Sequence, residues 1–177
     1  MIVGICGKKF SGKSMCAKHL VRTQGFECVG FAKPIKDAMY ALGLTWAQVQ
    51  GDEKELPCAL LGGKTPRYAM QTLGTEWGRD TIHADLWIRS WMARAASFAN
   101  VVVDDVRFTN EVEAIRSAGG ILIEIVTPVN RRAEFGAVTA NDDHPSERVP
   151  DGIEYTIYND STLPDMYGSL ADIIARS

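Results

Sequence analysis

The chain has 177 residues, of which 46% are hydrophobic and 23% are charged, and its formal net charge is −3. A chain of this length and composition predicts a globular protein with one domain and a sizeable core. A slightly negative charge gives no basic field that would demand nucleic acid, so we expect no nucleic-acid partner.

The first predicted element is a buried strand over residues 2–6, and a glycine-rich loop follows it directly. Residues 7–14 read Gly-Lys-Lys-Phe-Ser-Gly-Lys-Ser, a complete G-x-x-x-x-G-K-[ST] phosphate loop. Apolar residues recur at helical spacing over 15–22, so the loop lies between a strand and a helix. In that context backbone N–H groups and the helix N-terminus bind a polyphosphate. The alternative is a glycine turn that only caps the helix, with Ser11 or Ser14 as N-cap.

The residues of the loop predict a nucleoside triphosphate site. Gly7 and Gly12 allow the tight turn and the close approach of the backbone to phosphate. Lys13 would reach the β- and γ-phosphates, and Ser14 would place its hydroxyl on Mg²⁺.

A second strand is predicted over 27–31 and a helix over 33–43. Lys33 and Lys36 come at the start of this helix, where a cation opposes the helix dipole. Their position makes sense if an anion also binds there, and the alternative is two solvated lysines. Residues 44–64 predict a short helix and a loop.

Residues 65–98 predict two helices, with Gly74 and Gly78 weakening the join between them. This region carries arginines that suit phosphate and tryptophans that suit a stacked base. They are Arg67, Arg79, Trp77, Trp87 and Trp91, with Thr75 between them. The alternative is that the tryptophans are core residues, and it applies most strongly to Trp91.

The strand predicted over 100–104 ends in Asp104-Asp105-Val106-Arg107. Because ligands gather at the carboxyl ends of parallel strands, Asp104 is expected near Mg²⁺, with Asp105 as the competing candidate. Arg107 would bring its planar guanidinium group, which suits phosphate, to the same end of the strand. The alternative is an aspartate N-cap followed by a surface arginine.

A strand over 120–126 is followed by a long irregular connection over 127–150, which we predict to act as a lid over the triphosphate. Its Arg131 and Arg132 could stabilise the transferring phosphoryl group, or they could be a solvated pair. His144 and Glu147 could hydrogen-bond within the lid. A last strand over 154–158 and a helix over 163–175 follow, with Asn159 to Thr162 as turn and N-cap.

Alternating strands and helices predict an α/β fold: a P-loop domain with a five-stranded, mostly parallel sheet and helices on both faces. We expect one domain over 1–177, with a helical region over 32–98 that could hold a nucleotide and a lid over 127–150.

The four cysteines, Cys6, Cys16, Cys28 and Cys58, show no C-x-x-C spacing. A zinc site is therefore not expected, and a reduced cytoplasmic setting is the simplest interpretation. Cys6 fits a small buried hydrophobe. No apolar stretch has transmembrane length and the N-terminus is a strand, so we expect neither a membrane partner nor a signal peptide.

Several blocks of the sequence resemble the deoxynucleoside monophosphate kinases of tailed bacteriophages, which are P-loop kinases. The blocks are residues 7–14, Phe31 to Ala38, Gln71 to Arg79, Asp85 to Trp87, Asp104 to Phe108, His144 to Glu147, and Asn159-Asp160. Together they span nearly the whole chain in the expected order. The resemblance implies transfer of the ATP γ-phosphoryl, with Mg²⁺, to a deoxynucleoside 5′-monophosphate, in the host cytoplasm if a phage encodes the chain.

The resemblance also implies roles for individual residues. Catalysis would involve Lys13, Asp104, Arg107, Arg131 and Arg132, with Ser14 and Asp104 at the metal. The donor nucleotide would contact Gly7, Lys8, Ser11, Gly12, Lys13, Ser14, Met15 and Asn159, with Asn159 near the adenine. The acceptor would contact Phe31, Lys33, Lys36, Arg67, Gly74, Thr75, Arg79, Trp87 and Arg107.

Two other functions remain open. One is a dephospho-coenzyme A kinase or another small-molecule kinase of the same fold. The other is a nucleotide-dependent switch, although the N-K-x-D motif of a guanine switch is absent from the sequence. The sequence leaves the accepted bases undecided, and it leaves open a homodimer.

Overall fold

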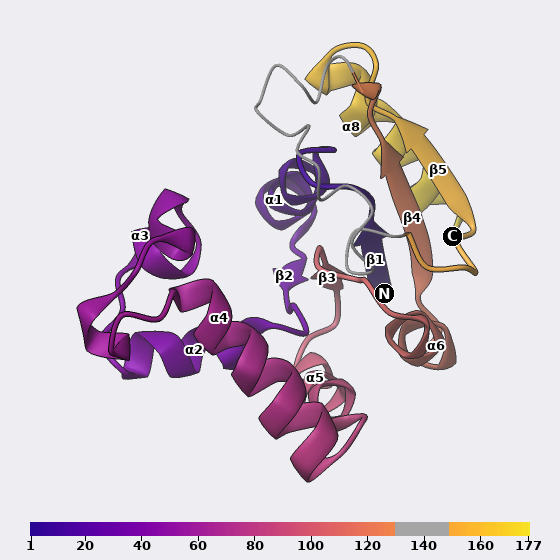
Figure 1. The fold of residues 1–177 in the computed structure, drawn as a ribbon. Helices are drawn as coiled ribbons and strands as arrows, with labels where there is room; N and C mark the ends of the chain where they lie inside the picture. Colours follow the sequence, from indigo (N-terminus) through magenta and orange to yellow (C-terminus); the bar gives the residue numbers. More distant parts are fainter. Residues whose placement is uncertain (130–148) are drawn as a thin grey trace. The chain divides into compact units, whose positions relative to one another are not determined.

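The computed structural model describes residues 1–129 and 149–177. In these residues five parallel strands form one sheet in the order β2-β3-β1-β4-β5, which confirms the predicted α/β fold (Figure 1). The strands are β1 (Ile2–Cys6), β2 (Glu27–Cys28), β3 (Val101–Val103), β4 (Ile121–Val126) and β5 (Tyr155–Tyr158). Because all strands run the same way, their carboxyl ends lie at one edge of the sheet.

Strand β1 has the predicted bounds, whereas the other four strands are shorter than the sequence predicts, and the difference is largest for β2. Residues 27–31 were expected to be extended, but β2 ends at Cys28. Val29 still donates a backbone hydrogen bond to Val102 at 2.9 Å, and the chain then turns at Phe31 and Ala32 into the next helix. The apolar pattern continues past the strand because Val29 and Phe31 are buried without belonging to it.

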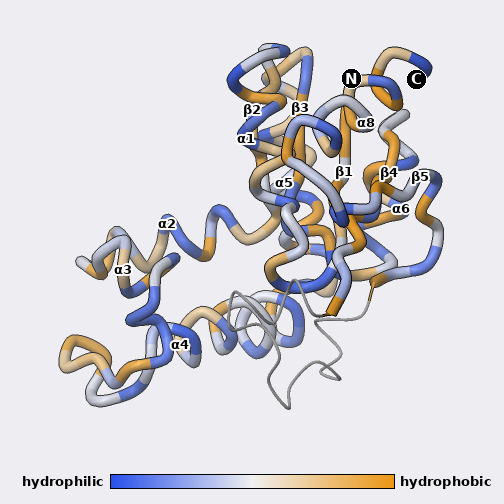
Figure 2. Tube along the Cα trace, turned by 90° about the horizontal axis from the view of Figure 1, so that it is seen from above, coloured by the Kyte–Doolittle hydropathy of each residue, from blue (hydrophilic) through white to orange (hydrophobic). Residues whose placement is uncertain are grey.

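Helices cover both faces of the sheet. Helix α1 (Lys13–Gln24) and helix α8 (Leu163–Arg176) pack on the face to which Val3 and Ile5 point, in one buried cluster with Leu20 and Leu170. Successive residues of a strand face opposite ways, so Gly4 points to the other face. There α6 (Thr109–Ser117) covers it, and a Cβ on Gly4 would lie 2.8 Å from Ile115. Figure 2 shows the hydrophobic character of β1, β3 and β4.

The chain divides into two compact units, residues 1–30 with 94–177, and residues 31–93. The second unit begins at residue 31 and ends at residue 93, and the predicted helical region spans 32–98. Its elements are α2 (Lys33–Ala41), α3 (Trp46–Val49), two short 3₁₀ turns (Asp52–Glu55 and Ala59–Leu61), α4 (Pro66–Thr72), a π-helix (Leu73–Ile82) and most of α5 (Leu86–Ala95). The short helix and loop predicted over 44–64 are confirmed.

The predicted join between the two helices of 65–98 was wrong. Gly74 and Gly78 do not separate helices but lie inside the π-helix, which continues α4 without a break. The chain turns only after Ile82, where His83 bonds back to the carbonyl of Gly78 at 3.0 Å. Glycine usually weakens a helix, but Gly78 here makes room for the ring of Trp87.

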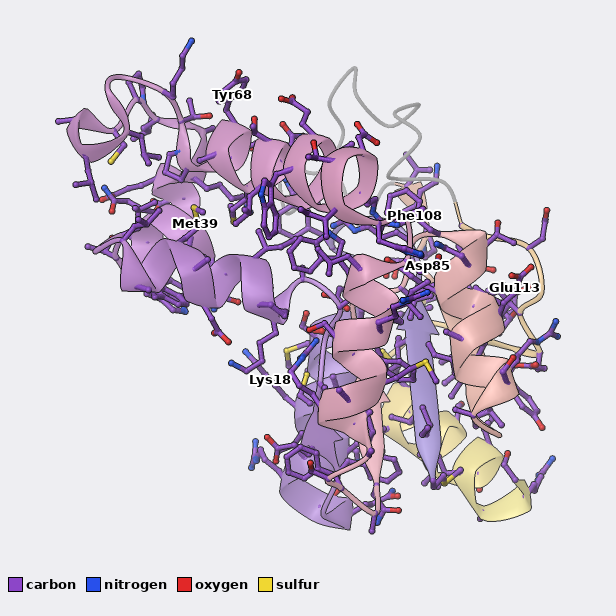
Figure 3. The ribbon with its side chains drawn as sticks, turned by 90° about the horizontal axis from the view of Figure 1, so that it is seen from below. Lys18, Met39, Tyr68, Asp85, Phe108 and Glu113 are labelled. Carbon is purple, nitrogen blue, oxygen red and sulfur yellow. The ribbon has the colours of Figure 1, made fainter. Side chains whose placement is uncertain are left out.

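The second unit has its own small core. Met39, Leu44 and Val49 are buried together, and Met70 and Leu73 pack against them. In Figure 3, Met39 lies between the helices of this unit, whereas Tyr68 projects outward from α4.

In the part of the chain that the structure describes, no helix is both long and apolar enough to cross a membrane.

Candidate functional site

The loop after β1 has the backbone of a phosphate-binding turn. Gly7 and Gly12 have φ angles of 136° and 107°, which glycine adopts far more readily than other residues. A Cβ on Gly7 would lie 2.4 Å from the carbonyl oxygen of Ile125. Phe10, at φ 62°, is the one non-glycine residue with positive φ in the described part of the chain. Both glycines are therefore required where the motif places them.

The N-terminus of α1 is open to an anion. Gly12 is its N-cap, and no side chain caps it, so the alternative in which Ser11 or Ser14 caps the helix is wrong. The first turn contains no acidic residue. Uncapped N–H groups and the positive end of the helix dipole together attract negative charge, as in other phosphate sites.

Lys13 folds back over the loop that precedes it. Its Nζ donates to the carbonyl oxygens of Gly7 at 2.6 Å and Lys8 at 2.8 Å. These contacts fix the side chain of Lys13 at the loop, where the positive charge can attract a phosphate group.

A hydroxyl and a carboxylate meet beside the start of α1. Ser14 Oγ donates to Asp104 Oδ2 at 2.8 Å, so the loop and the end of β3 contribute one side chain each. Asp105, the competing candidate, points toward Gly30, where an added Cβ would lie 2.8 Å from its Oδ2. The Sγ of Cys28 lies 3.9 Å from the other oxygen of Asp104.

Ser14 and Asp104 are hard oxygen ligands, which suit Mg²⁺. The described residues hold no group of three or more His, Cys, Asp or Glu side chains that could bind a metal by themselves. Mg²⁺ commonly takes one or two protein oxygens and completes its shell with substrate phosphates and water, and this pair fits that pattern.

Two residues beyond the loop hold its backbone. The carbonyl oxygen of Ser11 accepts from Thr127 Oγ1 at 2.8 Å and from Asn159 Nδ2 at 3.0 Å. Asn159 therefore contacts the loop itself, while Thr162 is the N-cap of α8, as the sequence predicted. Thr127 was missed by the sequence reasoning. The signal that selected Asp104, a polar residue directly after a strand, also applies to Thr127.

A backbone hydrogen bond fixes the position of Arg107. Its N–H donates to Glu111 Oε2 at 2.8 Å, and Glu111 is 2% exposed. Helix α6 has Phe108 as N-cap, so the alternative of an aspartate N-cap is wrong. The side chain of Arg107 is exposed, which leaves its guanidinium in contact with solvent and accessible to a ligand.

In the second unit, Trp87 is a packed side chain. It is 7% exposed, and its indole N–H donates to the carbonyl oxygen of Gly74 at 2.7 Å. A Cβ on Gly78 would lie 2.5 Å from the ring, so the π-helix needs glycine there to admit the indole. The structure thus supports the core interpretation for Trp87. Trp91, 1% exposed, is a core residue, which agrees with the core alternative for this tryptophan.

The other acceptor-side candidates differ in exposure. Phe31 is 3% exposed and packs against Trp91 with ring centres 5.0 Å apart, and Gly74 is buried. Thr75 is exposed and Arg79 is half-buried. The charged candidates have partners: Lys33 pairs with Asp37 at 2.7 Å, Arg67 with Glu55 at 2.6 Å, and Lys36 lies 3.5 Å from Gln50 Oε1. Lys33 matches the surface alternative, since its side chain is 54% exposed.

The thiols of Cys6 and Cys16 are buried and form no disulfide. Burial raises the pKa of the Cys6 and Cys16 thiols from 9.0 to about 12. Cys6 is therefore a small buried side chain, as predicted. The remaining candidates, Arg131, Arg132, His144 and Glu147 of the predicted lid, lie outside the described residues.

Solved structures of other kinases share this fold. A shikimate kinase from Aquifex aeolicus superimposes with a TM-score of 0.59 at 11% identity, over 99% of this chain and 96% of that one. An APS kinase from Mycobacterium tuberculosis gives a TM-score of 0.52 at 15% identity, over 99% and 97%. At such identities the similarity shows the fold and nothing more.

Sequence relatives are more specific. Residues 64–170 match the family model described as deoxynucleotide monophosphate kinase. A protein of Acanthamoeba polyphaga mimivirus assigned as a deoxynucleotide monophosphate kinase is 32% identical over 98% of this chain and 96% of its own length. The deoxynucleoside-5′-monophosphate kinase of Escherichia phage T5 is 33% identical over 47% of this chain, which is 34% of the phage protein. The chain belongs to the deoxynucleotide monophosphate kinase family.

Proposed function

We propose that this protein transfers the γ-phosphoryl group of ATP to deoxynucleoside 5′-monophosphates and forms the diphosphates. The observation that carries the proposal is a phosphate loop with an open helix N-terminus and the Ser14–Asp104 pair beside it, in a chain of this family. The loop accounts for a triphosphate donor, and the family accounts for the acceptor.

On the donor side, the triphosphate lies against the loop and the first turn of α1. Backbone N–H groups of the loop and of the first turn of α1 bind its oxygens, and Lys13 neutralises charge on the β- and γ-phosphates. Ser14 and Asp104 would hold Mg²⁺ on the phosphates. When bound there, Mg²⁺ supplies positive charge that offsets the repulsion between the two anionic substrates.

On the acceptor side, the second unit binds the monophosphate. Arg79 and Thr75 come from the π-helix, where Thr75 is exposed and Arg79 is half-buried. Lys36 supplies further positive charge, and Arg107 serves the acceptor phosphate from the end of β3. Lys33 and Arg67 pair with Asp37 and Glu55 and would have to exchange these partners to bind the acceptor. Phe31, Gly74 and Trp87 shape this unit from within, since all three are buried. Arg131 and Arg132 are proposed to stabilise the transferring group from the lid.

The reaction needs little covalent chemistry from the protein. An oxygen of the acceptor phosphate attacks the γ-phosphorus, and the bond from that phosphorus to the β–γ bridging oxygen breaks. The electron pair leaves with ADP. Positioning of the two nucleotides in line, charge neutralisation and exclusion of water then account for most of the rate acceleration.

A coupled assay of ADP formation tests the proposal. The protein is given Mg·ATP with each of the four common deoxynucleoside monophosphates, with the ribonucleotides, and with dephospho-coenzyme A. We expect ADP to form only when a deoxynucleoside monophosphate is present, with a matching amount of diphosphate product. Phosphorylation of dephospho-coenzyme A alone, or ADP formation that ignores the acceptor, contradicts the proposal.

Two lysines of α1 provide a matched pair of variants. Lys13→Ala removes the ammonium group at the loop and is expected to lower kcat by at least about 10²-fold while the protein stays folded. Lys18→Ala removes an exposed lysine five residues along the same helix and should leave kcat unchanged (Figure 3). Equal activity of the two variants would exclude the assigned role of Lys13.

A further inference from the structure

We propose that Thr127 and Asn159 are positioning residues that hold the Ser11–Gly12 peptide of the phosphate loop in a single orientation. The inference rests on the proposed function, in that the loop binds the phosphates of the donor nucleotide. Neither residue needs to touch the nucleotide to do this.

The contacts converge on one backbone atom. Thr127 Oγ1 and Asn159 Nδ2 both donate to the carbonyl oxygen of Ser11, at 2.8 and 3.0 Å. All three residues are buried, with exposed fractions of 8%, 8% and 1%. Thr127 directly follows β4 and Asn159 directly follows β5, and these strands pair with each other. The sheet therefore places the two donors side by side.

A fixed carbonyl also fixes the amide on the other side of the same peptide. The peptide unit is planar and trans, so the Ser11 carbonyl and the Gly12 N–H point in opposite directions. With the carbonyl bound to Thr127 and Asn159, the N–H of Gly12 is turned away from these donors. It is one of the loop N–H groups that a phosphate ligand uses.

Gly12 is the reason that this peptide needs to be held. Glycine populates positive and negative φ about equally, so the backbone beside it can rotate at little cost. Gly12 has a φ angle of 107°, and the hydrogen bonds from Thr127 and Asn159 to the Ser11 carbonyl restrain this peptide. The side chain of Ser11 does not help, because its Oγ has no hydrogen-bond partner among the described residues. A Cβ on Gly12 would lie 2.9 Å from Asn159 Nδ2, so a more rigid residue does not fit.

The test compares variants that remove one donor without changing side-chain size. Thr127→Val and Asn159→Leu each remove a donor, and Thr127→Ser keeps the hydroxyl. Thr156→Val is the matched control, because Thr156 is an exposed threonine of β5. For each protein we would measure the Kd of Mg·ADP by calorimetry, the KM values of ATP and of the acceptor, and the melting temperature.

We expect Thr127→Val and Asn159→Leu each to raise the Kd of Mg·ADP about three- to tenfold, the size of one net hydrogen bond. The KM of ATP should rise with it while the KM of the acceptor stays the same. The double variant should lose more than the product of the two single losses, because one remaining donor still holds the carbonyl. Thr127→Ser should bind Mg·ADP within twofold of the unmodified protein, as should Thr156→Val.

The proposal is overturned if the single variants lower only the melting temperature and leave the Kd of Mg·ADP unchanged. Equal rises of the KM for ATP and for the acceptor would also overturn the proposal, because the effect of the variants would then not be specific to the nucleotide that the loop binds. Failure of the proposed function looks different: the unmodified protein would form no deoxynucleoside diphosphate. In that case the Kd of Mg·ADP, measured by calorimetry, still tests whether Thr127 and Asn159 hold the Ser11–Gly12 peptide.

Discussion

The side chain of Ser14 donates a hydrogen bond to Asp104, with 2.8 Å between Oγ and Oδ2. The two residues are 90 positions apart in the chain, and the pairing of β1 with β3 brings them together. This contact selects Asp104 over Asp105 as the partner of the phosphate loop. It also allows the two aspartates to be compared by experiment.

Asp104→Asn is expected to raise the Mg²⁺ concentration for half-maximal activity by about 10- to 100-fold, the effect usual for a group that orients or binds a metal ligand. The amide keeps the size of the side chain but loses its negative charge. A titration of the initial rate with Mg²⁺ at saturating ATP measures the change. Asp105→Asn is the control and should shift the Mg²⁺ requirement much less. A larger shift from Asp105→Asn would reverse the assignment.

Phe10→Gly is expected to stabilise the protein. A bulky residue at φ 62° is strained by about 1 kcal/mol or more, and glycine adopts this conformation without strain. The ring contributes little burial in return, because it is 45% exposed. Thermal unfolding should show a rise in Tm of about 2–4 °C for each kcal/mol. Phe10→Ala keeps the strain of a Cβ and removes the ring, so an equal rise in Tm for both variants would contradict strain as the cause.

Trp87→Phe is expected to lower the free energy of unfolding by about 2 kcal/mol, because the carbonyl of Gly74 loses a buried donor and part of the ring volume is lost. Denaturation in urea measures the free energy of unfolding. Trp46→Phe is the matched control, since Trp46 is 64% exposed, and it should change stability by less than about 0.5 kcal/mol. Gly78→Ala should destabilise as well, because its Cβ would lie 2.5 Å from the indole. Equal stability of the two tryptophan variants would show that Trp87 is not a packing residue.

Stability is expected to fall between pH 9 and pH 12. Burial raises the pKa of Cys6 and of Cys16 to about 12 in the folded protein, from 9.0. As the pH rises through this window, the unfolded chain loses the thiol protons while the folded protein keeps them, which favours unfolding. Each thiol then lowers the free energy of unfolding by about 1.4 kcal/mol per pH unit.

The cysteine variants separate this effect from other groups that titrate at high pH. Cys6→Ala should flatten the fall in stability, and Cys16→Ala should do the same, both measured by denaturation at several pH values. An unchanged slope in the Cys6 and Cys16 variants would show that the buried thiols do not control it.

Sequence reasoning succeeded where the signal is local. The strand–loop–helix context of residues 7–14, the carboxyl-end position of Asp104 and the N-cap Thr162 all follow from neighbours in the chain. It failed at Gly74 and Gly78, because glycine inside a helix usually indicates a weak point. Here Gly78 makes room for the ring of Trp87, and the carbonyl of Gly74, 13 residues from Trp87, accepts the indole N–H. A helix formed around a distant side chain gives no periodic signal of its own.

The phosphate loop and the α/β fold of this protein are predictable from local sequence patterns. A phosphate loop carries its own backbone geometry, and alternating apolar strands and amphipathic helices specify a parallel sheet. Which side chains meet at that loop depends on the tertiary structure. Asp104, Thr127 and Asn159 come from three different strand ends, and the strand order β3-β1-β4-β5 brings the first to Ser14 and the other two to the carbonyl of Ser11. Strand order depends on packing between distant segments, and no local pattern encodes it.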